Sequence, residues 1–119
     1  MWDIEYTSDF EMWWKTLTES GQEDVAATVG LLEEKGPNLP FPYSSGINIS
    51  RHSHMRELRI QHRGQPYRVL YAFDPRRTGI LLLGGDKAGD DRWYEKYIPK
   101  ADRLYDEHIE VLKNEGLLP

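Results

Sequence analysis

The chain has 119 residues, no cysteine and a formal net charge of −5. A chain of this length can bury the core of one domain, so we expect a single domain over residues 1–119. The lack of cysteine excludes disulfides, thiolate zinc sites and a cysteine nucleophile, and it is typical of a reducing cytoplasm. The sequence shows neither an apolar run of membrane-spanning length nor a signal peptide, so we expect a soluble cytoplasmic protein with no membrane partner.

The first third of the chain predicts a short strand and then two helices. The segment WDIEYT alternates between apolar and polar residues, as a strand does. Ser8 and Glu11 form a capping box that predicts the start of one helix, and Ser20 and Glu23 form a second box. The Gly-Pro pair at 36–37 predicts the end of the second helix. Both helices carry an apolar stripe that we expect in the core: Phe10, Trp13, Trp14 and Leu17, then Val25, Val29 and Leu32.

The remainder of the chain predicts a loop, three strands and a helix. Residues 37–50 are rich in proline and small polar residues and predict a loop, with a short extended piece at GINIS. Residues 56–73, RELRIQHRGQPYRVLYAF, alternate on both sides of a turn and predict a β-hairpin. The run TGILLLGG predicts a central strand. A helix is expected from Asp90, with Pro99 in the first turn of a new or kinked helix.

The predicted order of elements is β-αα-βββ-α. We therefore expect an α+β fold in which a small, twisted, mainly antiparallel sheet carries an N-terminal αα-hairpin and a C-terminal helix.

Charge is segregated along the chain. Residues 51–87 contain eight arginines and lysines against three acids, a local charge of +5, so the remainder of the chain carries −10. Three histidines, at 52, 54 and 62, lie in the same segment. A basic surface on an acidic protein predicts a polyanionic ligand at that surface.

The hairpin predicts where the cations converge. A two-residue turn at Gly64-Gln65 would pair Ile60 with Val69 on a buried side and would make Arg59 and Arg68 diagonal neighbours on the other. Two guanidinium groups at that distance repel each other unless an anion lies between them. Lys87 follows two glycines that leave room at the end of the next strand. Three cations from adjacent strands could therefore bind one phosphate.

The hairpin RELRI…YRVLYAF, the strand ILLLGG, the following DK and the tyrosine-bearing helix resemble the RelE/ParE toxin superfamily. The resemblance is to its HigB-like branch, the phage-derived Gp49-like proteins. It implies the toxin of a type II toxin–antitoxin pair that cleaves messenger RNA on the ribosome without a metal or another cofactor. It also implies two partners besides RNA: the ribosome and a HigA-like helix-turn-helix antitoxin.

The resemblance implies roles for residues at matching positions. Arg59 and Arg68 would hold the phosphate, and Lys87 would complete this clamp or donate a proton. Tyr94 would stack on or orient a base, and His52 or His54 would be the general base or acid. The expected catalytic set is Arg59, Arg68, Lys87, His54 and Tyr94, the expected RNA contacts are Arg51, His52, Arg56, Arg63 and Arg92, and no metal ligand is expected.

The sequence departs from the family in three ways. It is acidic overall, it has Asp86-Lys87 where many relatives have a histidine-arginine pair, and its C-terminal helix is long and acidic. Because an acidic helix would repel RNA, we expect that helix on the side opposite the active face. Two alternative functions stay open, a non-enzymatic ParE-like gyrase inhibitor and a non-toxic, phage-derived nucleic-acid-binding module. We expect the antitoxin to contact the acidic αα-hairpin.

Overall fold

The computed structural model describes residues 1–119 and contains one five-stranded sheet with strand order β1-β5-β4-β3-β2. Only β1 and β5 pair in parallel; the other pairs are antiparallel. The elements are β1 (Ile4–Tyr6), α1 (Ser8–Thr16), α2 (Glu19–Lys35), a 3₁₀ turn (Gly36–Asn38), β2 (Ser44–Gly46), β3 (Arg56–His62), β4 (Gln65–Phe73), β5 (Gly79–Asp86) and α3 (Trp93–Asn114). The predicted α+β fold is confirmed, and β2 is an additional strand. GINIS is not the extended piece, because β2 ends at the first residue of that segment.

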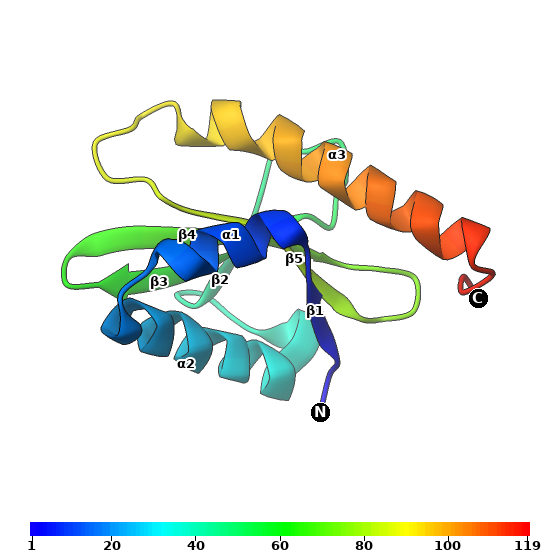
Figure 1. Ribbon diagram of the computed structural model, residues 1–119, viewed down its shortest axis with the longest axis horizontal. Helices are drawn as coiled ribbons and strands as arrows, with labels where there is room; N and C mark the ends of the chain where they lie inside the picture. Colours follow the sequence, from blue (N-terminus) through cyan, green and yellow to red (C-terminus); the bar gives the residue numbers. More distant parts are fainter.

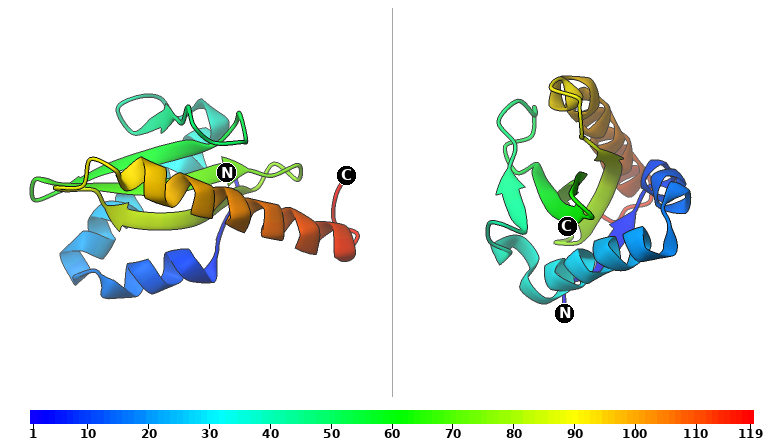
Figure 2. Two further views of the ribbon diagram at one scale, coloured as in Figure 1. Left: turned by 90° about the horizontal axis from the view of Figure 1, so that it is seen from above. Right: turned by 90° about the vertical axis from the view of Figure 1, so that its left-hand side faces the viewer.

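The sheet lies between two helical layers, as Figures 1 and 2 show: α1 and α2 cover one face, and α3 runs across the other. Each face has its own core. Phe10, Val25 and Leu32 pack on Leu58, Ile60, Tyr67, Val69 and Tyr71 under α1 and α2, whereas Trp93, Ile98, Ala101 and Tyr105 of α3 pack on Leu70, Ala72, Ile80 and Leu82. None of the three helices has the length and apolar character needed to span a membrane.

The two predicted capping boxes do not cap the helices. Thr7 is the N-cap of α1, and its Oγ1 accepts a hydrogen bond from the amide of Phe10 at 3.1 Å. Thr18 is the N-cap of α2, and its Oγ1 accepts from the amide of Gly21, also at 3.1 Å. Threonine provides the same hydroxyl acceptor as serine, so the helices begin at these earlier residues. The end of α2 at Lys35, capped by Gly36, is as predicted.

The predicted register of the hairpin is wrong by two residues, although the faces are right. The turn is Arg63-Gly64, not Gly64-Gln65, and both turn residues have positive φ, 51° and 79°. A two-residue type I′ turn requires positive φ at both positions, and glycine is favoured at the second. Arg59 is therefore directly opposite Arg68, and Ile60 is opposite Tyr67.

Strand β5 does not end at its two glycines. Gly84 and Gly85 lie inside the strand, and a Cβ atom on them would come within 2.1 Å of Trp13 and 2.8 Å of Trp93, respectively. Each glycine thus makes room for a tryptophan, one from α1 and one from α3, on opposite faces of the sheet. The close approach to these side chains is the reason for the glycines, and not the sharp turn before Lys87 that the sequence suggests.

Helix α3 differs from the prediction in two ways. It is one helix from Trp93 to Asn114 with Pro99 inside it, so no new helix begins at the proline. It also packs on the sheet face that carries Arg59 and Arg68, not on the opposite side. The reason is that β4 is apolar on both faces, so the face of Leu70 and Ala72 also needs a cover.

Candidate active site on the α3 face

Glu57 is the centre of the candidate site. It is only 4% exposed, because it lies between β2 and β4 on the sheet face beneath the N-terminal end of α3. Its Oε1 accepts a hydrogen bond from the hydroxyl of Tyr94 at 2.6 Å, and its Oε2 accepts one from the hydroxyl of Ser45, also at 2.6 Å. Ser45 is the residue directly opposite Glu57 on β2. A buried carboxylate needs such partners, together with cations, to stay charged.

Two arginines supply the cations. Nη1 of Arg59 lies 3.4 Å from Oε2 of Glu57, and Nε of Arg68 lies 3.6 Å from Oε1. The two arginines differ in exposure: the Arg59 side chain is 30% exposed, whereas that of Arg68 is 6% exposed. Nη1 of Arg68 donates to the carbonyl of Tyr67 at 2.9 Å, but its Nε has no hydrogen-bond partner. Arg59 can therefore reach a ligand, while Arg68 lies beside Glu57 with one donor unused.

Tyr94 and Lys87 complete the cluster. Tyr94 is in the first turn of α3, and Nζ of Lys87 lies 5.8 Å from the centre of its ring. Burial raises the pKa of the Tyr94 hydroxyl, and so does its hydrogen bond to the Glu57 carboxylate, while Arg68 acts in the opposite direction. The Tyr94 hydroxyl is therefore protonated at neutral pH and donates a hydrogen bond to Glu57.

A groove leads to this cluster from the edge of the sheet. It has a volume of about 540 Å³ and is lined by residues of the loop before β2, of β3 and β4, and of α2: Pro42, Tyr43, Arg59, Gln61, Pro66 and Arg68, with Asp24, Ala27, Thr28 and Ile60 on the α2 side. Strand β2 pairs only with residues 56–58, and the amide of Arg59 donates to the carbonyl of Tyr43, so β3 has an open edge after Arg59. The groove brings solvent to Arg59, whereas Arg68 also lines it but stays almost fully buried.

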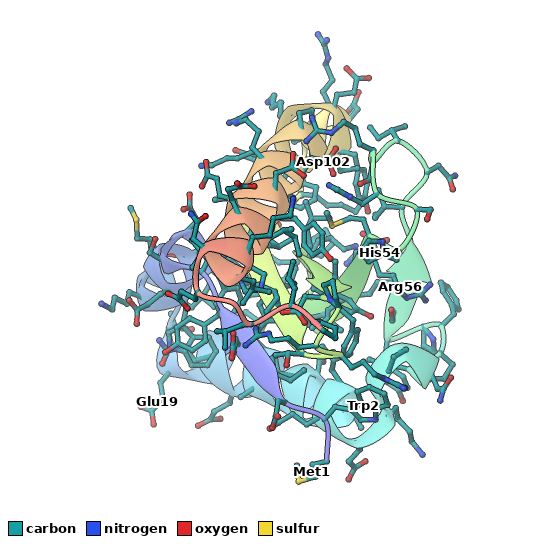
Figure 3. The ribbon with its side chains drawn as sticks, turned by 90° about the vertical axis from the view of Figure 1, so that its right-hand side faces the viewer. Met1, Trp2, Glu19, His54, Arg56 and Asp102 are labelled. Carbon is teal, nitrogen blue, oxygen red and sulfur yellow. The ribbon has the colours of Figure 1, made fainter.

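The predicted histidines lie elsewhere, in the loop before β3 that packs against the middle of α3 (Figure 3). Nε2 of His54 is 3.1 Å from the hydroxyl of Tyr105, and Nε2 of His52 is 2.9 Å from Oδ1 of Asp106. Tyr105 is eleven residues after Tyr94 on α3, which is about 16 Å along a helix. The structure therefore does not bring His54 to Glu57.

Arg51 belongs to the same contact between the loop and α3. Its backbone amide donates to Oδ2 of Asp102 at 3.1 Å, and its side chain pairs with Asp106. Figure 3 labels Asp102 on the helix and His54 near the beginning of β3. Burial and the neighbouring His52 lower the pKa of His54, so this imidazole is neutral at pH 7.

The other predicted RNA contacts are also dispersed. Arg56 is on the opposite face of β3 from Glu57, and its Nε donates to Ser44 at 3.0 Å. Arg63 is exposed in the hairpin turn, and Arg92 is exposed before α3 and pairs with Glu95. Of the ten predicted residues, the structure gathers Arg59, Arg68 and Tyr94 around one carboxylate, and it places Lys87 beside the Tyr94 ring. No group of three His, Asp or Glu residues is close enough to bind a metal.

Glu57 and Ser45 were missed by the sequence analysis. The signal for Glu57 was present, since it is the only acid in the strand RELRIQH and lies two residues from Arg59, on the same face. Ser45 gave no signal, because its role depends on the pairing of β2 with β3.

Comparison with known families gives a match to "Phage derived protein Gp49-like (DUF891)" over residues 12–106. The chain belongs to this family. It is 45% identical over 94 residues to a Mycobacterium tuberculosis protein named "Putative toxin HigB3", an alignment that covers 78% of this chain and 81% of the relative. The predicted resemblance to HigB-like, Gp49-like proteins is thus confirmed.

A second relative of this Gp49-like chain, also from Mycobacterium tuberculosis, is named "Putative toxin HigB2". It is 39% identical over 111 residues, which is 89% of this chain but 55% of the relative, so the chain spans about half the length of that protein. The comparison with solved structures gives no match.

Proposed function

We propose that this Gp49-like chain is the toxin of a type II toxin–antitoxin pair and that it cleaves messenger RNA on the ribosome, in the cytoplasm, without a metal ion. The observation that carries this proposal is the convergence of Arg59 and Tyr94 on the buried carboxylate of Glu57, with Lys87 beside the Tyr94 ring. The names of the two relatives support the toxin role.

RNA can be cleaved without a metal when its own 2′-hydroxyl attacks the adjacent phosphorus atom. The reaction needs a base that takes the 2′-hydroxyl proton, cations that stabilise the extra negative charge on the phosphate, and an acid that protonates the leaving 5′-oxygen. The cluster contains one candidate for each task. Glu57 is the base, Arg59 and Lys87 are the cations, and Tyr94 is the acid.

The hydrogen bond between Tyr94 and Glu57 allows both groups to return to their starting protonation states after cleavage. During cleavage, the bond from phosphorus to the 2′-oxygen forms and the bond to the 5′-oxygen breaks, which leaves a 2′,3′-cyclic phosphate and a 5′-hydroxyl. Glu57 has then gained a proton and Tyr94 has lost one. Because the two groups are 2.6 Å apart, the proton can return from Glu57 to Tyr94 directly.

Arg68 acts through Glu57 in this proposal and is a positioning residue. Its guanidinium group is buried beside the carboxylate, and it can hold Glu57 in place between β2 and β4.

The test is inducible expression of the chain with and without the gene beside it, with messenger RNA ends mapped by primer extension. We expect growth arrest and new 5′ ends in translated messages when the chain is expressed alone, and neither when the neighbouring antitoxin is present. Cleavage by purified protein on programmed ribosomes should persist in EDTA at concentrations that leave the ribosome intact. Growth arrest without new ends, together with inhibited supercoiling by gyrase, would instead favour the ParE-like alternative.

A further inference from the structure

We infer that Phe41 and Tyr43 form a stacking site for an unpaired nucleobase of single-stranded RNA, next to the cluster around Glu57. Both residues belong to the loop Leu39–Tyr43, between α2 and β2, and neither has a chemical role in the cluster described above. The inference deepens the proposed function, since it takes the substrate to be single-stranded RNA.

The two aromatic rings are accessible to solvent, although the chain has two apolar cores in which such rings could be buried. Phe41 is 68% exposed and Tyr43 is 45% exposed. Exposed aromatic rings cost free energy in water, and in RNA-binding proteins they serve as platforms on which bases stack. Stacking accepts any base, because every base has a π face.

A cation lies directly beside the ring of Phe41. The guanidinium carbon of Arg59 is 5.1 Å from the centre of the Phe41 ring, and the same guanidinium group is 3.4 Å from Glu57. Tyr43 lines the groove together with Arg59 and Arg68. Arg59 thus joins the aromatic loop to the catalytic cluster, and a nucleotide with its phosphate near Arg59 has its base within reach of Phe41.

The loop is also held in place before any RNA binds. Leu39 is buried in the core under α2, and the carbonyl of Tyr43 accepts a hydrogen bond from the amide of Arg59 at 2.9 Å. The amide of Tyr43 donates to the carbonyl of Pro40 at 3.0 Å. A platform that is already ordered loses little conformational entropy on binding.

The charges of the groove favour an anionic ligand such as RNA over a basic or an apolar partner, and the aromatic rings favour a ligand with bases. The one acid that lines the groove, Asp24, is 2.6 Å from Nδ1 of His62 and is thus engaged within the protein. Arg59 and Arg68 provide the positive charge, and the aromatic surface comes from Tyr43 in the groove and from Phe41 beside Arg59. Alternation of cations and aromatic rings is the pattern that single-stranded nucleic acids require.

The inference is tested with a fluorescent 12-nucleotide 2′-O-methyl RNA, which this chemistry cannot cleave, and with an abasic oligonucleotide of the same length and charge. Fluorescence anisotropy at low salt gives the affinity of the full chain for each. We expect Phe41→Ala with Tyr43→Ala to weaken binding of the first probe by about 5- to 150-fold, the worth of one stacked base, and to leave binding of the abasic probe unchanged. Phe41→Trp should keep the affinity, and Phe41→Leu, which retains an apolar side chain without a ring, should lose it.

Met12→Ala is the matched control, because Met12 is 70% exposed on α1, away from the groove. The inference is overturned if the wild-type chain binds both probes equally, or if the double variant binds the first probe as the wild type does. It is also overturned if the double variant loses affinity only for the purified antitoxin, since the loop would then be a protein contact. If the chain binds RNA through these rings but cleaves no message in cells, the stacking site stands and the proposed nuclease function fails.

Discussion

The two faces of the sheet are built from similar apolar residues but end differently at their edges. Under α1 and α2 the face is filled along its length, from Tyr71 to Tyr67, and even His62 at its end is buried, stacked on Tyr67. Under α3 the apolar core stops at Leu70, and the same strands continue with Arg68, Arg59 and Glu57. One helix covers this face where two cover the other.

This difference shows how a small sheet can have a core and a site on one face. Because α3 crosses the sheet with only its N-terminal turn over the polar cluster, Tyr94 reaches Glu57 while Arg59 remains partly open to solvent. The α1 and α2 face has no comparable group of charges and serves stability. The predictions below separate the two faces, from the largest expected effect to the smallest.

Replacing the carboxylate at the centre of the site should have the largest effect. Glu57→Gln keeps the size of the side chain but removes the proton acceptor, so we expect RNA cleavage to fall by about 10²- to 10⁴-fold. The measurement is the rate of cleavage on programmed ribosomes. Glu33→Gln, on α2, is the control and should cleave normally. A Glu57→Gln variant with normal cleavage would remove Glu57 from the reaction.

The two arginines should respond differently because they differ in burial. Arg68→Ala leaves Glu57 as a buried charge without its nearest buried cation, and we expect the free energy of unfolding to fall by about 3–5 kcal/mol. Arg59→Ala should cost little stability but about 1.5–3 kcal/mol of phosphate binding, which is about a ten- to hundredfold loss of cleavage rate. Urea unfolding and cleavage rates measure the two effects. Equal stability of the two variants would contradict this assignment.

The paired glycines of β5 allow the faces to be disturbed one at a time. Gly84→Ala pushes against Trp13 and Gly85→Ala against Trp93, and each should cost about 1–3 kcal/mol of stability through overpacking. Only Gly85→Ala should also slow cleavage, because Trp93 precedes Tyr94 on α3. Cleavage rates compared under conditions where both variants are folded test this. Equal loss of rate in both would mean that the faces are coupled.

The antitoxin should bind the α1 and α2 face and leave the site uncovered. An apolar groove of about 520 Å³ between these helices and β1 is lined by Tyr6, Trp14 and Val29, and also by Glu11 and Glu33, which suits a basic amphipathic segment. Glu33→Lys with Glu34→Lys should weaken the complex by about fivefold, roughly 1 kcal/mol, and leave cleavage unchanged. Arg59→Glu, in the site, and Arg63→Glu, in the hairpin turn, are the comparison. If only these two arginine variants lose the antitoxin, the antitoxin covers the face of the site.

The smallest expected effect is that of pH on the loop that packs against α3. The folded chain lowers the pKa of His54 below 6.5, so the unfolded chain takes up this proton more readily. The free energy of unfolding should therefore fall as the pH drops through 6.5 toward the lower pKa that His54 has in the folded chain. The decrease is small because the side chain is only partly buried. Thermal unfolding at pH 7.5 and 5.5 should show a smaller decrease in His54→Gln than in the wild type.

Much of the fold was accessible from the sequence because it depends on local patterns. Alternation in WDIEYT and RELRIQH, the stripe from Phe10 to Leu17 and the Gly-Pro pair after α2 predict elements that the structure contains. The face shared by Arg59 and Arg68 was also predicted, since the period of a strand is two residues.

The tertiary structure decided which residues meet at the site. The Arg63-Gly64 turn set the register that places Arg59 opposite Arg68, and a shift of two residues changes every pair without changing the pattern. The position of α3 depends on the apolar residues of both faces of β4, so it could not be read from the charge of the helix. The same packing brings Tyr94 to Glu57 and keeps His54 with Tyr105, because the site is made by contacts between strands and a helix that lie far apart in the sequence.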